Sequence, residues 1–172
     1  MKLSLSNPRD LALIAIMTAL VMALTMLVQI PTPIGGFVHL GDVAIYFVAL
    51  AFGPIVGLIA GGLGTAFADL ALGYAAFAPL TLVVHGLQGY VAGWIFKKNP
   101  SPLFGVIAVV VGGVILVGGY FLGEIAMWGV AAAASEIPAN TIQASAGALG
   151  LVVYLAVAQA YPRLRQAQDE AA

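Results

Sequence analysis

Five long stretches of the 172-residue chain contain no charged side chain at all: residues 11–30, 43–68, 79–96, 103–123 and 138–161. A helix needs about 20 mostly apolar residues to cross a bilayer, so each stretch can supply at least one crossing. Charged residues make up only 8% of the sequence, against about 25% in soluble domains. The chain is therefore predicted to be an integral membrane protein, with one transmembrane domain over residues 1–172.

Several classes of protein are disfavoured at this point. The first apolar stretch is longer than the apolar part of a signal peptide, and no small-residue cleavage site follows it, so a retained first helix is expected. The chain has no cysteine, which excludes disulfides and thiol chemistry. It has no basic face for phosphates, so no nucleic-acid partner is expected.

The number of crossings depends on residues 43–72, which fit either one long helix or two short ones. Gly53-Pro54 lies inside this segment and is a strong turn signal. Two helices place all the basic residues on one side of the membrane, as the positive-inside rule expects. These residues are Lys2, Arg9, Lys97, Lys98, Arg163 and Arg165.

The sequence thus predicts an all-α bundle of six transmembrane helices with both termini in the cytoplasm. The expected helices cover about residues 10–30, 40–53, 55–72, 79–97, 102–130 and 138–161. Loops 31–39, 73–78 and 131–137 are then extracellular. The second helix is too short to span a bilayer core by itself, so neighbours must shelter it or it must tilt.

Ionisable side chains inside such a bundle are costly and usually mark a binding site or a pathway. Those of this chain come from different helices but share one depth near the expected outer face. Helical spacing adds polar neighbours, such as Thr81 on the face of His85 and Gln88. The candidate pocket residues are Phe37, His39, Asp42, Asp69, His85, Gln88, Tyr120, Glu124, Trp128, Asn140 and Gln143. Glu136, just before Pro138, is instead expected to be solvated.

Several candidates also have a purely structural interpretation. Asp69 could pair with a buried partner or lie near water. Asp42 could cap the second helix, and His85 could bond to a neighbouring backbone group. Tyr120 and Trp128 could be aromatic residues of the membrane interface. Asn140 and Gln143 could cap and pack the last helix.

Three alanines, Ala15, Ala19 and Ala23, recur every four residues on the first helix. Small residues at this spacing let another helix approach closely. The stripe could pack inside the bundle, or it could dock another membrane protein.

Taken together, four segments resemble the S component, the substrate-capture subunit, of energy-coupling factor (ECF) vitamin transporters. They are the alanine stripe, the stretch from Pro31 to the HLGD motif at 39–42, FGPIVGLIAGGLGTAFADLALGY at 52–74, and EIPANTIQ at 136–143. The resemblance covers nearly the whole chain and fits the predicted six helices.

The resemblance implies a vitamin or vitamin precursor bound near the outer face, with the first loop as a lid. It implies a transmembrane scaffold subunit that contacts the alanine stripe, and two ATP-binding-cassette ATPases that use the ATP, in a prokaryotic plasma membrane. The chain itself has no phosphate-binding P-loop, and no bound cofactor or metal is expected. His85 and Gln88 stand where relatives often carry lysine and glutamate, and Lys2 replaces the histidine of the nickel and cobalt branch.

The segment GGFVHLGD, residues 35–42, is interpreted as a flexible lid leading into a helix start. Asp42, Asp69 and Glu124 would make the pocket negative, which favours a neutral or cationic heterocycle. A pyrimidine or thiazole thiamine precursor, a pyridoxine-type vitamer and riboflavin all remain candidates. An intramembrane enzyme and a self-sufficient carrier or channel are the rival functions, although no G-x-S-x-G or H-E-x-x-H motif is present.

Overall fold

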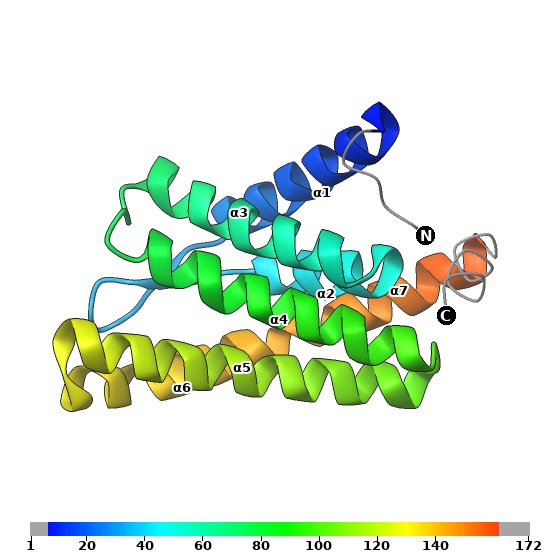
Figure 1. The fold of residues 1–172 in the computed structure, drawn as a ribbon. Coiled ribbons are helices and arrows are strands. Elements are labelled where there is room, and N and C mark those ends of the chain that lie inside the picture. The colour runs from blue at the N-terminus through cyan, green and yellow to red at the C-terminus, as the bar shows by residue number, and fades with distance from the viewer. Residues whose placement is uncertain (1–6, 162–172) are drawn as a thin grey trace.

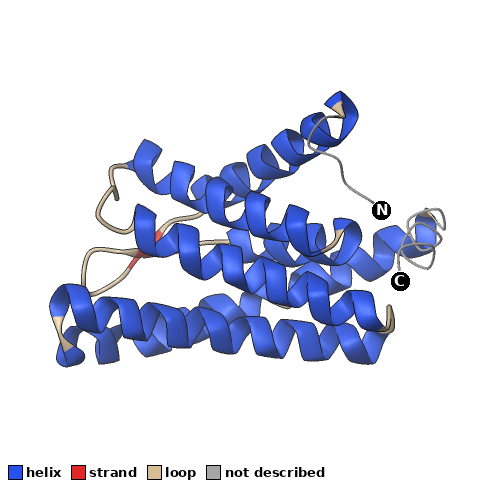
Figure 2. Cartoon of the chain, in the orientation of Figure 1, coloured by secondary structure: helices blue, strands red, loops and turns tan. Residues whose placement is uncertain are grey.

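The computed structural model describes residues 7–161 and folds most of them into helices (Figure 1; Figure 2). The helices are α1 (Pro8–Leu27), α2 (Gly41–Phe52), α3 (Pro54–Leu72), α4 (Ala78–Lys98), α5 (Pro102–Trp128), α6 (Val130–Gly147) and α7 (Leu149–Ala160). Two short strands, β1 (Ile30–Pro31) and β2 (Phe37–Val38), form an antiparallel hairpin in the first loop. The predicted all-α membrane fold is confirmed, and the small hairpin was not predicted.

Four helical segments of the described chain are long and apolar enough to cross a membrane unaided. They are α1, α3, α5 and the continuous stretch of α6 and α7, Val130–Ala160. Counted with α2 and α4, and with α6 and α7 taken as one bent helix, the bundle has the six expected segments. Which ends face the cytoplasm stays a prediction.

The turn between α2 and α3 lies where Gly53-Pro54 indicates it. Gly53 ends α2 with a φ of 89°, a conformation that favours glycine. Its N–H still donates to the Ala49 carbonyl at 3.0 Å. Pro54 then opens α3, where its missing N–H is harmless because the first helical N–H groups have no helical partner. This tight turn forces the two helices to lie antiparallel.

Helix α2 is the centre of the bundle. Nine of its 12 residues are buried, and it packs against α1, α3, α4, α6 and α7. The expectation that its neighbours shelter this short helix is therefore confirmed. Tyr46 is fully buried, and its hydroxyl donates to the Val109 carbonyl at 3.0 Å, which ties α2 to α5.

The helices run back and forth between two ends of the bundle (Figure 1). The start of α1 and the end of α7 lie at one end, together with the α2–α3 and α4–α5 turns. The first loop, the α3–α4 turn and the α5–α6 turn gather at the other end. We call this second end the loop end.

The largest error of the sequence prediction concerns residues 131–137, which form no loop. Helix α6 already begins at Val130 and continues through Pro138. A proline removes one backbone hydrogen bond and often stands at a helix start. Pro138 was therefore expected to open the last helix, with a loop before it. The alanine run before it, residues 131–134, is a strong helix former and was the available signal. The chain bends later, at Ala148, where α6 gives way to α7.

Glycine lets α3 and α4 approach each other at the backbone. A Cβ atom on Gly57 would lie 2.6 Å from the Gly89 carbonyl oxygen, and one on Gly61 would lie 2.7 Å from the His85 carbonyl oxygen. No side chain fits at these distances, so the glycines of this seam set the separation of the two helices. The seam also fixes Asp69 of α3 relative to His85 of α4.

Helix α1 packs on α2 and α3 through one face only. Ile14 and Val21 are buried on that face. The three alanines of the stripe, Ala15, Ala19 and Ala23, are all exposed on the described protein. The stripe therefore does not pack inside this bundle, and the interpretation as internal packing is wrong.

Candidate binding site

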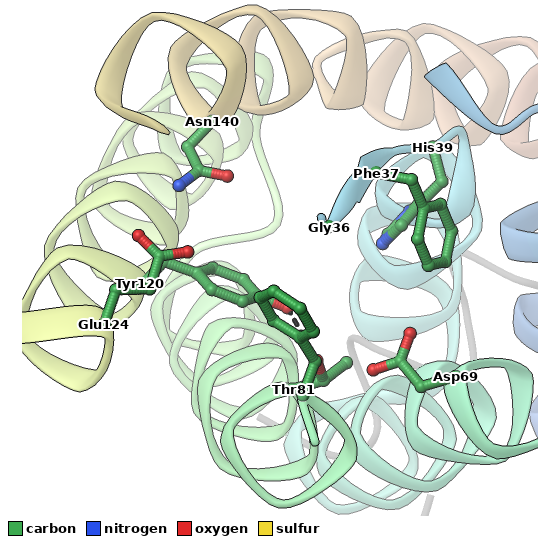
Figure 3. Close-up of a pocket in the computed structure, with 9 residues that line it drawn as sticks. Gly36, Phe37, His39, Asp69, Thr81, Tyr120, Glu124 and Asn140 are labelled. Carbon is green, nitrogen blue, oxygen red and sulfur yellow. Dashed lines mark hydrogen bonds between the residues drawn. The ribbon is translucent and has the colours of Figure 1, made fainter. Parts of the chain in front are cut away.

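A small cavity opens at the loop end, between the first loop and helices α3 to α6 (Figure 3). The first loop covers it, and α3, α4, α5 and α6 each contribute polar side chains. The lining residues are Gly36, Phe37, His39, Asp69, Phe77, Thr81, Tyr120, Glu124 and Asn140. The predicted convergence of polar groups from separate helices at one depth is thus present in the structure.

Opposite walls of the cavity carry carboxylates. In Figure 3 Asp69 lies on one side, near Phe37, and Glu124 lies on the other side, near Asn140. Thr81 and Tyr120 lie between them, with their hydroxyl oxygens 2.8 Å apart. A ligand in the cavity would therefore meet acidic groups at two of its edges.

A second group of predicted residues forms a hydrogen-bonded cluster beside the cavity. The Gln88 amide donates to Asp42 Oδ1 at 2.6 Å. His85 Nε2 lies 3.7 Å from Asp42 Oδ2 and 3.4 Å from Gln143 Nε2. His85 Nδ1 lies 3.3 Å from the Tyr120 hydroxyl. Tyr120 lines the cavity, so the buried cluster is connected to the site by hydrogen bonds.

The structural interpretations of these residues are mostly wrong. Asp42 makes no capping bond, and His39 Nδ1 accepts from the first N–H of α2, that of Gly41, at 3.1 Å. Asn140 and Gln143 lie well inside α6 and so cap nothing. Tyr120 is buried rather than at an interface.

Trp128 is the one pocket candidate that the structure leaves outside both the cavity lining and the hydrogen-bonded cluster. It is 39% exposed, and its ring packs on Phe77, 4.8 Å between centroids. Phe77 does line the cavity. Trp128 therefore supports the wall without facing the ligand space.

His39, Asp42 and His85 have possible metal-ligating atoms within 4.8 Å of one another. The ring nitrogen of His39 nearest to Asp42 Oδ2 is Nδ1, at 3.8 Å, and its lone pair already accepts from Gly41. Burial lowers the pKa of His39 to about 4, against the opposing effect of the Asp42 carboxylate, so the ring is neutral at pH 7. We therefore interpret the group as a hydrogen-bonded network.

Sequence reasoning missed Gly36 and Phe77 as pocket residues and Glu136 as a near-pocket residue. Thr81 was expected as a polar neighbour, because it shares the helical face of His85 and Gln88, and it does line the cavity. Glu136 is buried, which contradicts its predicted solvation, and it accepts from the Ile34 N–H at 3.1 Å. Gly36 and Phe77 come from loops, where no periodicity points to a contact.

The site is rich in acceptors and poor in donors. Its carboxylates, Asp42, Asp69, Glu124 and the nearby Glu136, are all buried. Within residues 7–161 none of them pairs with lysine or arginine. Four of the site's buried acceptor atoms have no hydrogen-bond partner: Asp42 Oδ2, Asp69 Oδ2, Gln88 Oε1 and Glu124 Oε2. Unpaired buried polar atoms are costly, so the site is complementary to a ligand that brings donors.

Fold and site together define a class: a multi-pass helical membrane protein with a polar, loop-covered pocket for a small molecule at one end. A sequence model of the ECF-type riboflavin transporter S component matches residues 5–161. The chain therefore belongs to the S components of ECF transporters. It is a substrate-binding transporter subunit and not an enzyme, and membership implies partner subunits of an ECF module.

Two relatives were also found. The chain is 36% identical to the thiamine precursor transporter HmpT of Lactococcus lactis subsp. cremoris (strain MG1363). The match extends over 143 residues and covers 82% of each of the two proteins. It is 39% identical over 124 residues to an uncharacterised protein of Pyrococcus woesei, which is 72% of this chain and 83% of that protein.

Proposed function

We propose that this S component captures a small heteroaromatic vitamin precursor that is neutral or cationic and rich in hydrogen-bond donors, with a thiamine precursor pyrimidine as the first candidate. The observation that carries this proposal is the pair of buried acceptor atoms without a partner in the cavity walls, Asp69 Oδ2 and Glu124 Oε2. An amino group and a hydroxyl group on one ring would satisfy both of them. An anionic vitamin would instead bring further acceptor atoms to walls that already carry the Asp69 and Glu124 carboxyl groups.

Ring size supports the same candidate. The cavity is small, and Phe37, Phe77 and His39 close in on it from the loop side. A single heteroaromatic ring suits such a space better than the three fused rings of riboflavin. The name of the Lactococcus lactis relative points in the same direction. A thiazole precursor or a pyridoxine-type vitamer is the second choice.

The rest of the proposed cycle depends on partners. The site faces the outside, both termini face the cytoplasm, and the prokaryotic plasma membrane is the location. The exposed alanine stripe of α1 contacts a transmembrane scaffold subunit, and two ATPases supply the energy. The exposure of Ala15, Ala19 and Ala23 supports this role, since small residues allow close helix contact in lipid.

The proposal is tested by calorimetry on the purified subunit in detergent or nanodiscs. The panel holds a hydroxymethylpyrimidine, a hydroxyethylthiazole, pyridoxine, riboflavin and an anionic vitamin such as biotin. We expect the pyrimidine to bind at least tenfold more tightly than the others. Tight preference for the anionic compound would overturn the argument from unpaired acceptor atoms, and mass spectrometry of any co-purified small molecule supplies an independent answer.

Loss of a cavity carboxylate is expected to weaken binding of the preferred compound. Glu124→Gln and Asp69→Asn each turn one of two acceptor oxygens into an NH2 donor with little change of shape. A donor of the ligand that faces this NH2 group loses its partner, which costs about 1–3 kcal/mol, so each change is expected to raise Kd by roughly 10- to 100-fold. Asp10→Asn, a carboxyl change at the opposite end of the bundle, is the control and should leave Kd unchanged. Unaltered affinity in both cavity variants would contradict the assignment.

A further inference from the structure

The first loop, residues 28–40, covers the cavity and is called the lid loop below. Gly36, Phe37 and His39 of this loop line the cavity directly. Phe37 also packs on Tyr74 of the α3–α4 turn, 4.5 Å between ring centroids. A ligand that passes between these residues must displace the loop. What holds the loop in place therefore controls access.

Two side chains of α6 bind the backbone of the lid loop. The Ile34 N–H donates to Glu136 Oε1 at 3.1 Å, and the His39 N–H donates to Gln143 Oε1 at 3.0 Å. Both acceptors are buried, 3% and 2% exposed. Buried hydrogen bonds of this kind are costly to leave unmade, so opening the loop must break or replace them.

The two acceptors lie on one stripe of α6 with a cavity residue between them. Glu136, Asn140 and Gln143 are all buried, and their spacing of four and three residues places them on one helical face. Asn140 lines the cavity, whereas Glu136 does not. A shift of α6 caused by a ligand at Asn140 would therefore also move both attachment points of the loop.

We propose that Glu136 and Gln143 are positioning residues that fasten the lid loop to α6 and so set the rate at which the site opens. Glu136 does not line the cavity, and its Oε1 accepts from the loop backbone at the Ile34 N–H. The Gln143 side chain connects the lid loop to the buried cluster, because its Oε1 accepts from the His39 N–H and its Nε2 lies 3.4 Å from His85 Nε2. Asn140, which lies between Glu136 and Gln143 on α6, lines the cavity.

The sharpest test compares Glu136→Ala with Glu136→Gln. The amide of glutamine keeps an acceptor oxygen at the same reach and should still hold the Ile34 N–H, whereas alanine cannot. We expect Glu136→Ala to speed ligand dissociation about tenfold, the effect of losing one hydrogen bond to a charged acceptor. Glu136→Gln should speed dissociation clearly less than Glu136→Ala, because a neutral amide oxygen still accepts the Ile34 N–H, although more weakly than a carboxylate. Stopped-flow fluorescence with the compound that binds most tightly measures both.

The dissociation measurement rests on the proposed function, because it needs a bound ligand. A second measurement needs no ligand and therefore tests this inference independently of the proposed function. The chain has no cysteine, so Val38→Cys introduces a single thiol in the half-buried β2 strand, outside the cavity lining. We expect Glu136→Ala to increase its maleimide labelling rate about tenfold, and Glu136→Gln to increase it clearly less.

Equal labelling of Val38→Cys with and without Glu136→Ala would overturn the inference, as would an equal increase for alanine and glutamine. A melting curve is recorded for each variant. A purely structural role of Glu136 would lower the melting temperature without making the labelling rates of the alanine and glutamine variants differ. If Glu136→Ala does not fold, Gln143→Ala removes the second bond and supplies the same comparison, with Gln143→Glu as the variant that keeps the acceptor.

Discussion

Gly57→Val is expected to leave no folded protein in the membrane. A Cβ at this position lies 2.6 Å from the Gly89 carbonyl oxygen and 2.9 Å from the Ala49 Cβ. The first obstacle is backbone and cannot rotate away, so α3 and α4 must separate along the seam. Overpacking of a side-chain core typically costs 1–3 kcal/mol, and a backbone obstacle costs more. That is a large part of the 5–15 kcal/mol that stabilises a typical protein.

The measurement is fluorescence-detected size exclusion followed by a thermal melt. We expect the variant to aggregate or to run without the monodisperse peak of the wild type. Gly118→Val is the matched control, since a Cβ on Gly118 of α5 meets nothing within 4 Å. A wild-type melting temperature for Gly57→Val would show that the seam is not held by glycine.

Ala19→Trp is expected to abolish uptake while leaving ligand binding by the purified subunit unchanged. Ala19 is exposed on the face of α1 that does not contact the bundle. An indole there does not disturb the described fold, but it prevents close approach of a second helix. The effect should therefore appear only when the scaffold subunit is present.

Uptake is measured in cells that express the whole ECF module, and complex formation by co-purification with the scaffold subunit. Val110→Trp is the control, because Val110 is 59% exposed on α5, away from the stripe. Undiminished uptake with Ala19→Trp would place the docking surface elsewhere. Loss of ligand binding in the isolated variant would instead indicate a folding defect.

Much of the fold could be predicted because membrane crossings leave strong signals in sequence. Uncharged stretches located the helices, and Gly53-Pro54 located the tightest turn. The prediction of a loop at residues 131–137 was wrong because a proline at a helix start and a proline inside a helix cannot be told apart from sequence. That single error also misplaced Glu136, whose burial follows once α6 is extended back to Val130.

The candidate site could be predicted in its helical part, but in its loop part only for Phe37 and His39. His85, Gln88, Asn140 and Gln143 share faces of regular helices, where spacing indicates direction. Phe77 and Gly36 reach the cavity through loops, whose path depends on the rest of the fold. No pattern in the sequence indicates that the lid backbone bonds to α6.

The shortness of α2 has a consequence for the distance that a ligand must still travel. Twelve residues at 1.5 Å each make a helix of only about 18 Å, against a hydrocarbon core of about 30 Å. Asp42 stands in the first turn of this helix, so the buried cluster around it begins only about 18 Å from the α2–α3 turn, which is less than the thickness of a bilayer core. Under the proposed orientation, a ligand beside this cluster lies within the bilayer core before the ATPases act.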